Sequence, residues 1–199
     1  METRAASAAE ADAITRVVTQ AFATDPVWEP ALRRGEGRTD HHEPYWRLFV
    51  DGAMRHGTVR TTPGGEACAV WLPPGSAELA DDQVAVLEAL LAKVLDAPAR
   101  AAMETLYSRF AMSRNAQAPH YYLSLLATDP AHRGRGVGQA LLAADLALWD
   151  AAGFPSYLES TNPGNDHRYA RAGFRAVGGF QAVVDDAPIT AMWRAVGGR

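Results

Sequence analysis

Three closely spaced glycines, in the stretch ATDPAHRGRGVGQALL at residues 127–142, constrain the fold more than any other feature of the chain. The aromatic and apolar segment 120–128 before them predicts a strand, and the amphipathic segment 136–152 after them predicts a helix. Glycine costs conformational entropy on folding, so a cluster of them indicates a backbone shape or a close approach that other residues would prevent. The sequence therefore predicts a strand–turn–helix unit whose turn has a specific structural or functional role.

The same turn is suited to binding an anion. Amide N–H groups at a helix N-terminus have no intrahelical partners, and the helix dipole favours negative charge there. Arg133 and Arg135 add positive charge, with His132 beside them. We therefore expect phosphate or pyrophosphate at this turn. The alternative is a glycine-rich helix start whose arginines are only solvated.

Several common site motifs do not fit the chain. A Walker A loop requires a lysine after its glycines, and none follows here. A dinucleotide fingerprint requires a third glycine where Gln139 stands. Neither G-x-S-x-G nor H-E-x-x-H occurs, and we expect the polar run His41-His42-Glu43 to be solvated rather than to bind a metal. The turn therefore favours an anion-binding protein outside these nucleotide-binding classes, with no metal.

Composition limits the class of protein further. The chain has 199 residues, 48% of them hydrophobic, which suits one globular domain over 1–199. A net charge of −4 argues against a nucleic-acid-binding surface. The single cysteine, Cys68, lies in an apolar run and is expected to be a buried, inert thiol. No leader-like N-terminus and no run of about 18 apolar residues occur, so we expect a cytoplasmic protein without a membrane partner.

Apolar spacing and turn residues predict the order of the elements along the chain. A long polar loop at 25–44 separates the first two helices, and two further helices fill 77–113. The order contains one βαβ unit and predicts a mixed α/β fold with a helical insertion at about 77–113. The other predicted elements are helices at 8–23, 44–56 and 165–173, and strands at 57–63, 66–74, 155–161, 174–184 and 189–196.

Two motifs resemble a known family. Arg133-Gly134-Arg135-Gly136-Val137-Gly138 matches the pattern [RQ]-x-x-G-x-[GA] of the GCN5-related N-acetyltransferase (GNAT) superfamily, and YLESTNPGNDHRYARAGF at 157–174 resembles the strand, splay and Tyr-x-x-x-Gly-Phe helix of that family. The resemblance is specific from about 120 to 175. The segments AFATDP and AVWLPPG look most like the branch that includes puromycin N-acetyltransferase.

The resemblance implies a fold and a cofactor. The fold would be a central mixed, mostly antiparallel twisted sheet flanked by helices, with a splay between two parallel strands. Acetyl-CoA would extend the sheet at this splay, with its pantetheine arm paired to one strand and its pyrophosphate at the glycine turn. The residues implied to hold the cofactor are Leu126, Ala127 and Thr128 through their backbone, then Arg133, Gly134, Arg135, Gly136, Val137, Gly138 and Gln139, and Asn165 on the other side.

The resemblance also implies direct transfer of an acetyl group to an amine. Tyr169 matches the family's acid tyrosine, and a phenol is protonated at neutral pH. The alternative is that its ring only packs against the sheet. Tyr122 and Ser124 lie on one face of the strand, at positions where relatives often have a Glu or His. The identity of the general base is therefore left open, and the candidates are a water relay, Glu159 and His120. A backbone N–H near Leu126 would stabilise the oxyanion.

The acceptor site is expected around Asp25, Trp28 and Glu29, with the helix that carries Tyr45 and Trp46. Carboxylates with aromatic walls suit a cationic organic amine, whereas the same tryptophans could fill a core or a dimer contact. A small primary amine is the favoured acceptor, with antibiotic, nucleoside-like and amino-sugar compounds among the candidates. Two alternatives stay open, a protein or peptide acceptor and a CoA-binding regulatory module that has lost transfer chemistry, and so does a homodimer.

Overall fold

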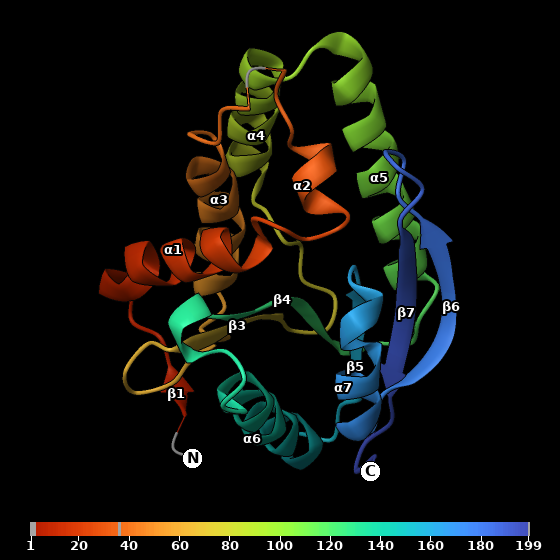
Figure 1. The fold of residues 1–199 in the computed structure, drawn as a ribbon. Coiled ribbons are helices and arrows are strands. Elements are labelled where there is room, and N and C mark those ends of the chain that lie inside the picture. The colour runs from red at the N-terminus through yellow and green to blue at the C-terminus, as the bar shows by residue number, and fades with distance from the viewer. Residues whose placement is uncertain (1–2, 36, 199) are drawn as a thin grey trace.

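A computed structural model describes residues 3–35 and 37–198, in which the strands form one mixed seven-stranded sheet (Figure 1). Its strand order is β1-β2-β3-β4-β5-β7-β6, and only β4 and β5 run parallel. The predicted mixed, mostly antiparallel sheet with one parallel pair is confirmed. The strands are β1 (Arg4–Ala5), β2 (Val59–Thr61), β3 (Ala67–Leu72), β4 (Tyr121–Thr128), β5 (Ser156–Ser160), β6 (Arg175–Gln181) and β7 (Pro188–Arg194).

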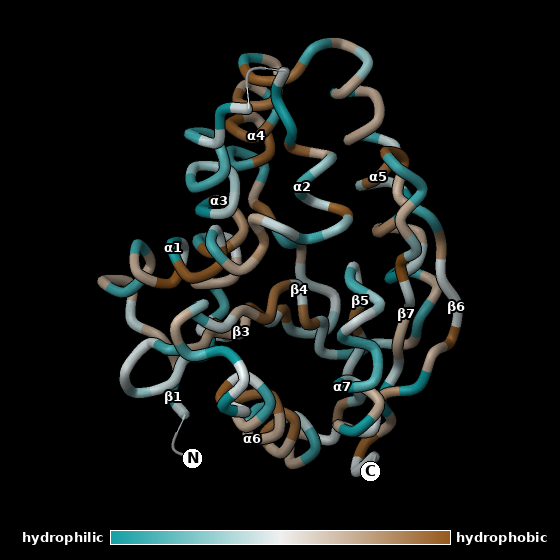
Figure 2. Tube along the Cα trace, viewed as in Figure 1, coloured by the Kyte–Doolittle hydropathy of each residue, from teal (hydrophilic) through white to brown (hydrophobic). Residues whose placement is uncertain are grey.

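Helices cover both faces of the sheet. In Figure 1, α1, α3 and α4 lie above β3 and β4, while α6 lies below them. Figure 2 shows apolar residues along β3, β4 and α6 where these layers meet, and every residue of β3 is buried. None of the helices in the described ranges is both long and apolar enough to span a membrane. The helices are α1 (Ala11–Phe22), α2 (Trp28–Ala31), α3 (His42–Met54), α4 (Asp81–Val94), α5 (Ala97–Asn115), α6 (Val137–Ala151) and α7 (Asp166–Arg171), with short 3₁₀ turns at Ala8–Glu10, Pro130–His132 and Pro163–Asn165.

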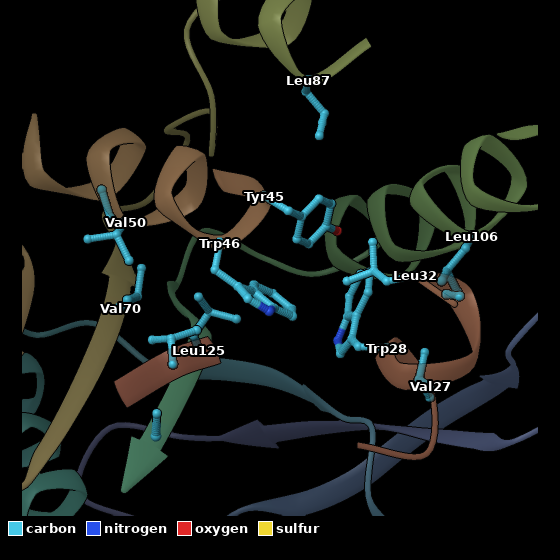
Figure 3. Packing of buried hydrophobic residues seen from close by; sticks show 14 of the residues in the cluster. Val27, Trp28, Leu32, Tyr45, Trp46, Val50, Val70, Leu87, Leu106 and Leu125 are labelled. Atoms are coloured by element: carbon cyan, nitrogen blue, oxygen red, sulfur yellow. The ribbon is translucent and has the colours of Figure 1, made fainter. Parts of the chain in front are cut away.

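The segment 25–44 is not the uninterrupted polar loop that its composition predicts. It contains α2, because Asp25 Oδ1 accepts the backbone N–H groups of Val27 and Trp28 at 2.9 and 3.1 Å and so starts the helix. Glu36 in this segment lies outside the described residues. Figure 3 shows Trp28 of α2 pointing toward Tyr45 and Trp46 of α3. Burial of these aromatic rings therefore overrides the polar character of the segment.

The expectation that His41 and His42 are solvated is wrong. Both side chains are buried, and their rings meet edge to face with centroids 4.6 Å apart. His41 Nε2 lies 2.7 Å from the carbonyl oxygen of Leu32 and so joins α3 to the end of α2. The pair therefore has a packing role that a run of polar letters does not reveal.

The two parallel strands separate soon after they meet. β4 and β5 pair only at Tyr121 with Ser156 and at Tyr122 with Tyr157, although β4 continues to Thr128. On its other side β4 pairs with β3 along almost its whole length, with a bulge that leaves Ser124 as an additional residue. Beyond Tyr122, one edge of β4 therefore has no strand partner within the described ranges.

A buried ion pair fixes α6 to the sheet. The carboxylate of Asp145 is inaccessible to solvent and accepts from Arg60 Nε at 3.0 Å and from Trp71 Nε1 at 2.9 Å. We expect Asp145→Ala to lower the free energy of unfolding by about 3–5 kcal/mol, because it leaves a partly buried guanidinium without its partner. Denaturant unfolding would measure this. In the exposed Arg47–Asp51 pair, Asp51→Ala serves as the matched control with a loss below about 1 kcal/mol, and equal losses would contradict the argument.

Candidate active site

A cavity of about 1100 Å³ runs through the splay between β4 and β5. This volume is slightly above the upper end of the roughly 300–1,000 Å³ range that is typical of ligand sites, so the cavity suits a large ligand. One end is formed by the glycine turn and α7, the middle by β4 and β5, and the far end by aromatic side chains. The aromatic residues are Phe22, Trp28, Trp46, Phe49, Tyr107 and Phe110.

The three glycines of the turn have two different physical roles. Gly134 and Gly136 have positive φ angles of 77° and 74°, a conformation that other residues adopt with strain. Gly138 instead packs against β4, since a Cβ atom there would lie 2.5 Å from Thr128 Oγ1. Gly136 is the N-cap of α6, and the first residues of this helix line the cavity. The backbone N–H groups at the start of α6 therefore face the cavity, where they could donate hydrogen bonds to an anion.

Cationic side chains surround the same end of the cavity. Arg133 lines it and donates to the carbonyl oxygen of Ala21 at 3.3 Å, and Arg168 and Arg171 approach from α7. Arg135 does not line the cavity, although it belongs to the same motif. Thus the anion end is positive, even though the chain as a whole is negative.

Glu159 lies at the middle of the cavity wall. Both of its carboxylate oxygens are buried, and neither has a partner of regular hydrogen-bond geometry among residues 3–35 and 37–198, although the hydroxyls of Tyr157 and Tyr122 lie close enough to interact with the carboxyl. Burial raises the pKa of this carboxyl to about 7, while the hydroxyls of Tyr157 and Tyr122 oppose the shift. Such a carboxyl exchanges a proton near neutral pH, which is the property of a general base.

Tyr169 lines the cavity on the α7 side. Its ring meets Phe174 edge to face at 6.2 Å, and its hydroxyl has no hydrogen-bond partner within the described part of the chain. Burial raises the pKa of the phenol to about 12, with the carboxylates of Asp25 and Asp166 adding to the shift. Tyr169 is therefore protonated at neutral pH and free to donate.

Comparison with known proteins agrees with this geometry. Residues 102–176, which include β4, the glycine turn, α6, β5 and α7, match the sequence model of the family described as Acetyltransferase (GNAT) domain. Residues 102–176 are therefore similar to a GNAT acetyltransferase domain.

Solved structures with the same fold cover almost the whole chain. A protein from Corynebacterium glutamicum described as histone acetyltransferase HPA2 and related acetyltransferase is 24% identical, with 98% of this chain and 95% of that chain covered and a TM-score of 0.64. Arylalkylamine N-acetyltransferase 2 from Aedes aegypti is 14% identical, with 98% of each chain covered and a TM-score of 0.69. The polyamine N-acetyltransferase of Drosophila melanogaster, which forms N-acetylagmatine, is 15% identical, with 98% and 99% covered and a TM-score of 0.64. The GNAT fold thus extends beyond 102–176.

The predicted cofactor-binding positions lie around one end of the cavity. Leu126 and Thr128 line it, whereas Ala127 points into the opposite core, as alternation along a strand requires. Asn165 also lines it from the far side of the splay, together with Gly134, Gly136, Val137, Gly138 and Gln139 of the turn.

The predicted acceptor residues are only partly brought together. Trp28 and Asp25 line the cavity, but the Asp25 carboxylate is already occupied, because Oδ2 accepts from Thr161 at 2.7 Å while Oδ1 caps α2. Glu29 does not line the cavity and pairs with Arg33 at 2.7 Å on the surface. Asp25 therefore shapes the cavity rather than offering a free charge to an acceptor.

Two charged residues of the cavity escaped the sequence analysis. Arg114 of α5 pairs with Glu78 at 3.0 Å and lies 4.8 Å from the ring centroid of Tyr122, and Ser124 donates to the same Glu78 at 2.7 Å. Tyr122 and Ser124 thus both contact the Glu78–Arg114 ion pair, as expected for two side chains on the same face of the strand. No spacing pattern links Glu78 to Arg114, so the sequence held no signal for this contact. The other candidate base, His120, packs against Tyr157 and Trp193 and does not line the cavity.

Proposed function

We propose that the protein is an acetyl-CoA-dependent N-acetyltransferase that acetylates the primary amine of a small molecule bearing an aromatic or apolar group. One observation carries this proposal: a single cavity joins an anion-binding turn to an aromatic wall, with an unpartnered carboxyl and a free phenol between them. Acetyl-CoA would supply the activated acetyl thioester. The chain's residues would supply position, a proton acceptor and a proton donor.

The residues present fit acetyl-CoA. The edge of β4 beyond Tyr122 has no strand partner, so its backbone groups are free to pair with the amides of the pantetheine arm. The amides that follow Gly136 would hold the pyrophosphate, with Arg133 balancing its charge. Leu126 would offer a backbone N–H to the thioester oxygen, where negative charge develops.

Tyr122 and Glu159 would remove the proton of the ammonium group. Glu159 lines the cavity, and its oxygens are closed to solvent. The neighbouring Tyr122 hydroxyl lowers the pKa of Glu159, and Glu159 raises the pKa of Tyr122. We infer that Tyr122 passes the proton of the acceptor to Glu159. Tyr169 would protonate the departing sulfur on the other side.

The aromatic wall supports the choice of acceptor. Trp28 stacks on Phe110 at 5.6 Å and meets Trp46 edge to face at 5.5 Å, so this end of the cavity offers flat apolar surfaces. The carboxylate of Glu78 is already paired with Arg114, which leaves no second free anion for a diamine. An arylalkylamine therefore fits this wall better than a polyamine does.

A panel of amines tests the function by the release of CoA thiol from acetyl-CoA. We expect tryptamine or phenethylamine to exceed agmatine in kcat/KM by at least about tenfold, since an apolar ring adds burial without an unpaired charge. Preference for agmatine or for peptide N-termini would contradict the small aromatic acceptor. CoA binding without turnover on any amine would favour a regulatory module instead.

A charge placed at Gly136 tests the phosphate end. Asp and Asn tolerate positive φ better than other side chains, and a Cβ atom at Gly136 meets no atom within 4 Å. We expect Gly136→Asp to weaken acetyl-CoA binding by about tenfold or more relative to Gly136→Asn, since only the former adds repulsion to the pyrophosphate. Calorimetry measures both variants, and equal affinities would place the anion elsewhere.

Three finer predictions accompany this function. The segments that resemble the puromycin N-acetyltransferase branch suggest a relationship to that group, and we retain it as a proposal. Cytoplasmic location and a homodimer are likewise proposed, the latter to be tested by sedimentation.

A further inference from the structure

A proton taken up by Glu159 needs a way out. Both carboxylate oxygens are closed to solvent, and bound acetyl-CoA and acceptor would fill the cavity on that side. The charged pair Glu78–Arg114 faces Glu159 from the cavity side, where the reactants would lie, and its two side chains are engaged with each other at 3.0 Å. A proton exit that avoids the reactants would therefore lie on another side of Glu159.

Tyr157 provides a hydroxyl on that side. It lies two positions before Glu159 on β5, hence on the same face of the sheet, and directly opposite Tyr122 on β4. Its side chain is fully buried, yet its hydroxyl is 2.7 Å from Ser113 Oγ on α5. Ser113 is partly exposed and does not line the cavity, so this contact leads out of the site.

We propose that Tyr157 and Ser113 form a proton exit from Glu159 to solvent at α5. The proposal rests on the proposed role of Glu159 as base. The carboxyl gives its proton to the Tyr157 oxygen while the phenol proton passes to Ser113 Oγ and the serine proton passes to water. Each hydroxyl gains one proton as it loses one, so the step needs no ionised phenol and no other reactant.

The electrostatic surroundings suit this direction of transfer. The groups that face Glu159 are Tyr122 from β4, Tyr157 from β5, Arg114 from α5 and Glu78 from the segment before α4. Of these, only Tyr157 makes a hydrogen bond that leads away from the cavity. His120 packs on the Tyr157 ring at 5.0 Å, but its Nδ1 lies 2.6 Å from the Ala118 carbonyl oxygen and is therefore occupied.

Steady-state kinetics of the full chain in H₂O and D₂O test the exit, with acetyl-CoA saturating and tryptamine varied. We expect Tyr157→Phe to lower kcat about tenfold, less than loss of the base itself, and to increase the solvent isotope effect on kcat. Ser113→Ala should act in the same direction, and Ser113→Thr, which keeps a hydroxyl, should restore the wild-type isotope effect. Acetyl-CoA affinity, measured by calorimetry, should stay unchanged in the three variants Tyr157→Phe, Ser113→Ala and Ser113→Thr. Unchanged affinity would show that each variant is folded.

Tyr121→Phe is the matched control. It removes a phenol hydroxyl from the opposite face of β4, where the ring stacks on Trp149 at 3.9 Å, and should leave kcat and the isotope effect unchanged. The exit is wrong if Tyr157→Phe and Ser113→Ala both keep the wild-type isotope effect while Glu159→Gln is impaired. If Glu159→Gln is fully active, both the proposed base and the exit are wrong.

Discussion

Glu159→Gln is expected to lower kcat by about 100-fold or more above neutral pH, because the amide cannot accept the proton that the acceptor must lose. In the wild-type protein, burial raises the pKa of this carboxyl to about 7. The rate should therefore fall as pH drops through about 7, where the base becomes protonated. A pH profile of kcat with one amine, in both proteins, would show this limb in the wild type only.

The same substitution should stabilise the protein, which separates a role in catalysis from a role in the fold. A carboxyl whose pKa is raised from 4.5 to about 7 on folding costs stability on the order of 3 kcal/mol once the pH exceeds both values. The gain from Glu159→Gln should be complete above pH 7 and disappear as pH falls toward 4.5. Thermal unfolding at several pH values measures it. A destabilised variant would instead indicate a structural carboxylate.

Tyr169→Phe is expected to lower kcat by about 100-fold while acetyl-CoA binding stays within about twofold of the wild type. The hydroxyl has no protein partner to lose within the described residues, and the ring contact with Phe174 is kept. The loss should therefore appear in kcat alone. Rate measurements with saturating amine, together with calorimetric affinities, give the two numbers.

The identity of the leaving group provides a second check on Tyr169. If the phenol protonates the departing sulfur, a thioester whose thiol leaves more easily should recover part of the lost rate in Tyr169→Phe. Equal losses with both thioesters, or an unchanged kcat with acetyl-CoA, would remove Tyr169 from the role of acid.

Sequence reasoning was most successful where backbone geometry dictates residue type. Gly134 and Gly136 have positive φ angles, and Gly138 lies too close to Thr128 for a Cβ atom. Each position favours glycine, so the turn could be recognised from the sequence. The parallel pair β4 and β5 and the helix between them follow from that unit and were predicted. Glu159 was one of several candidates for the general base, because the burial of its carboxylate oxygens cannot be seen from the sequence.

The acceptor end was less predictable because long-range packing forms it. Glu29 and Asp25 both looked like free carboxylates in a polar loop, yet one pairs with Arg33 and the other caps α2 and accepts from Thr161. The contacts of Glu29 with Arg33 and of Asp25 with the start of α2 are local, but α2 itself packs through Trp28 on Tyr45 and Trp46, and Thr161 is distant in sequence from Asp25.

The two ends of the cavity come from different stretches of the polypeptide. The anion turn, the splayed strands and Tyr169 all lie between 122 and 171, whereas the six aromatic side chains come from 22–49 and 107–110. In the proposed enzyme, substitutions in the earlier stretch would therefore change acceptor preference while the residues proposed to hold the thioester stay intact. If the proposed function is correct, a lineage with this architecture would acquire new amine acceptors by substitutions at one end, and the same positions could be engineered without changing the other end.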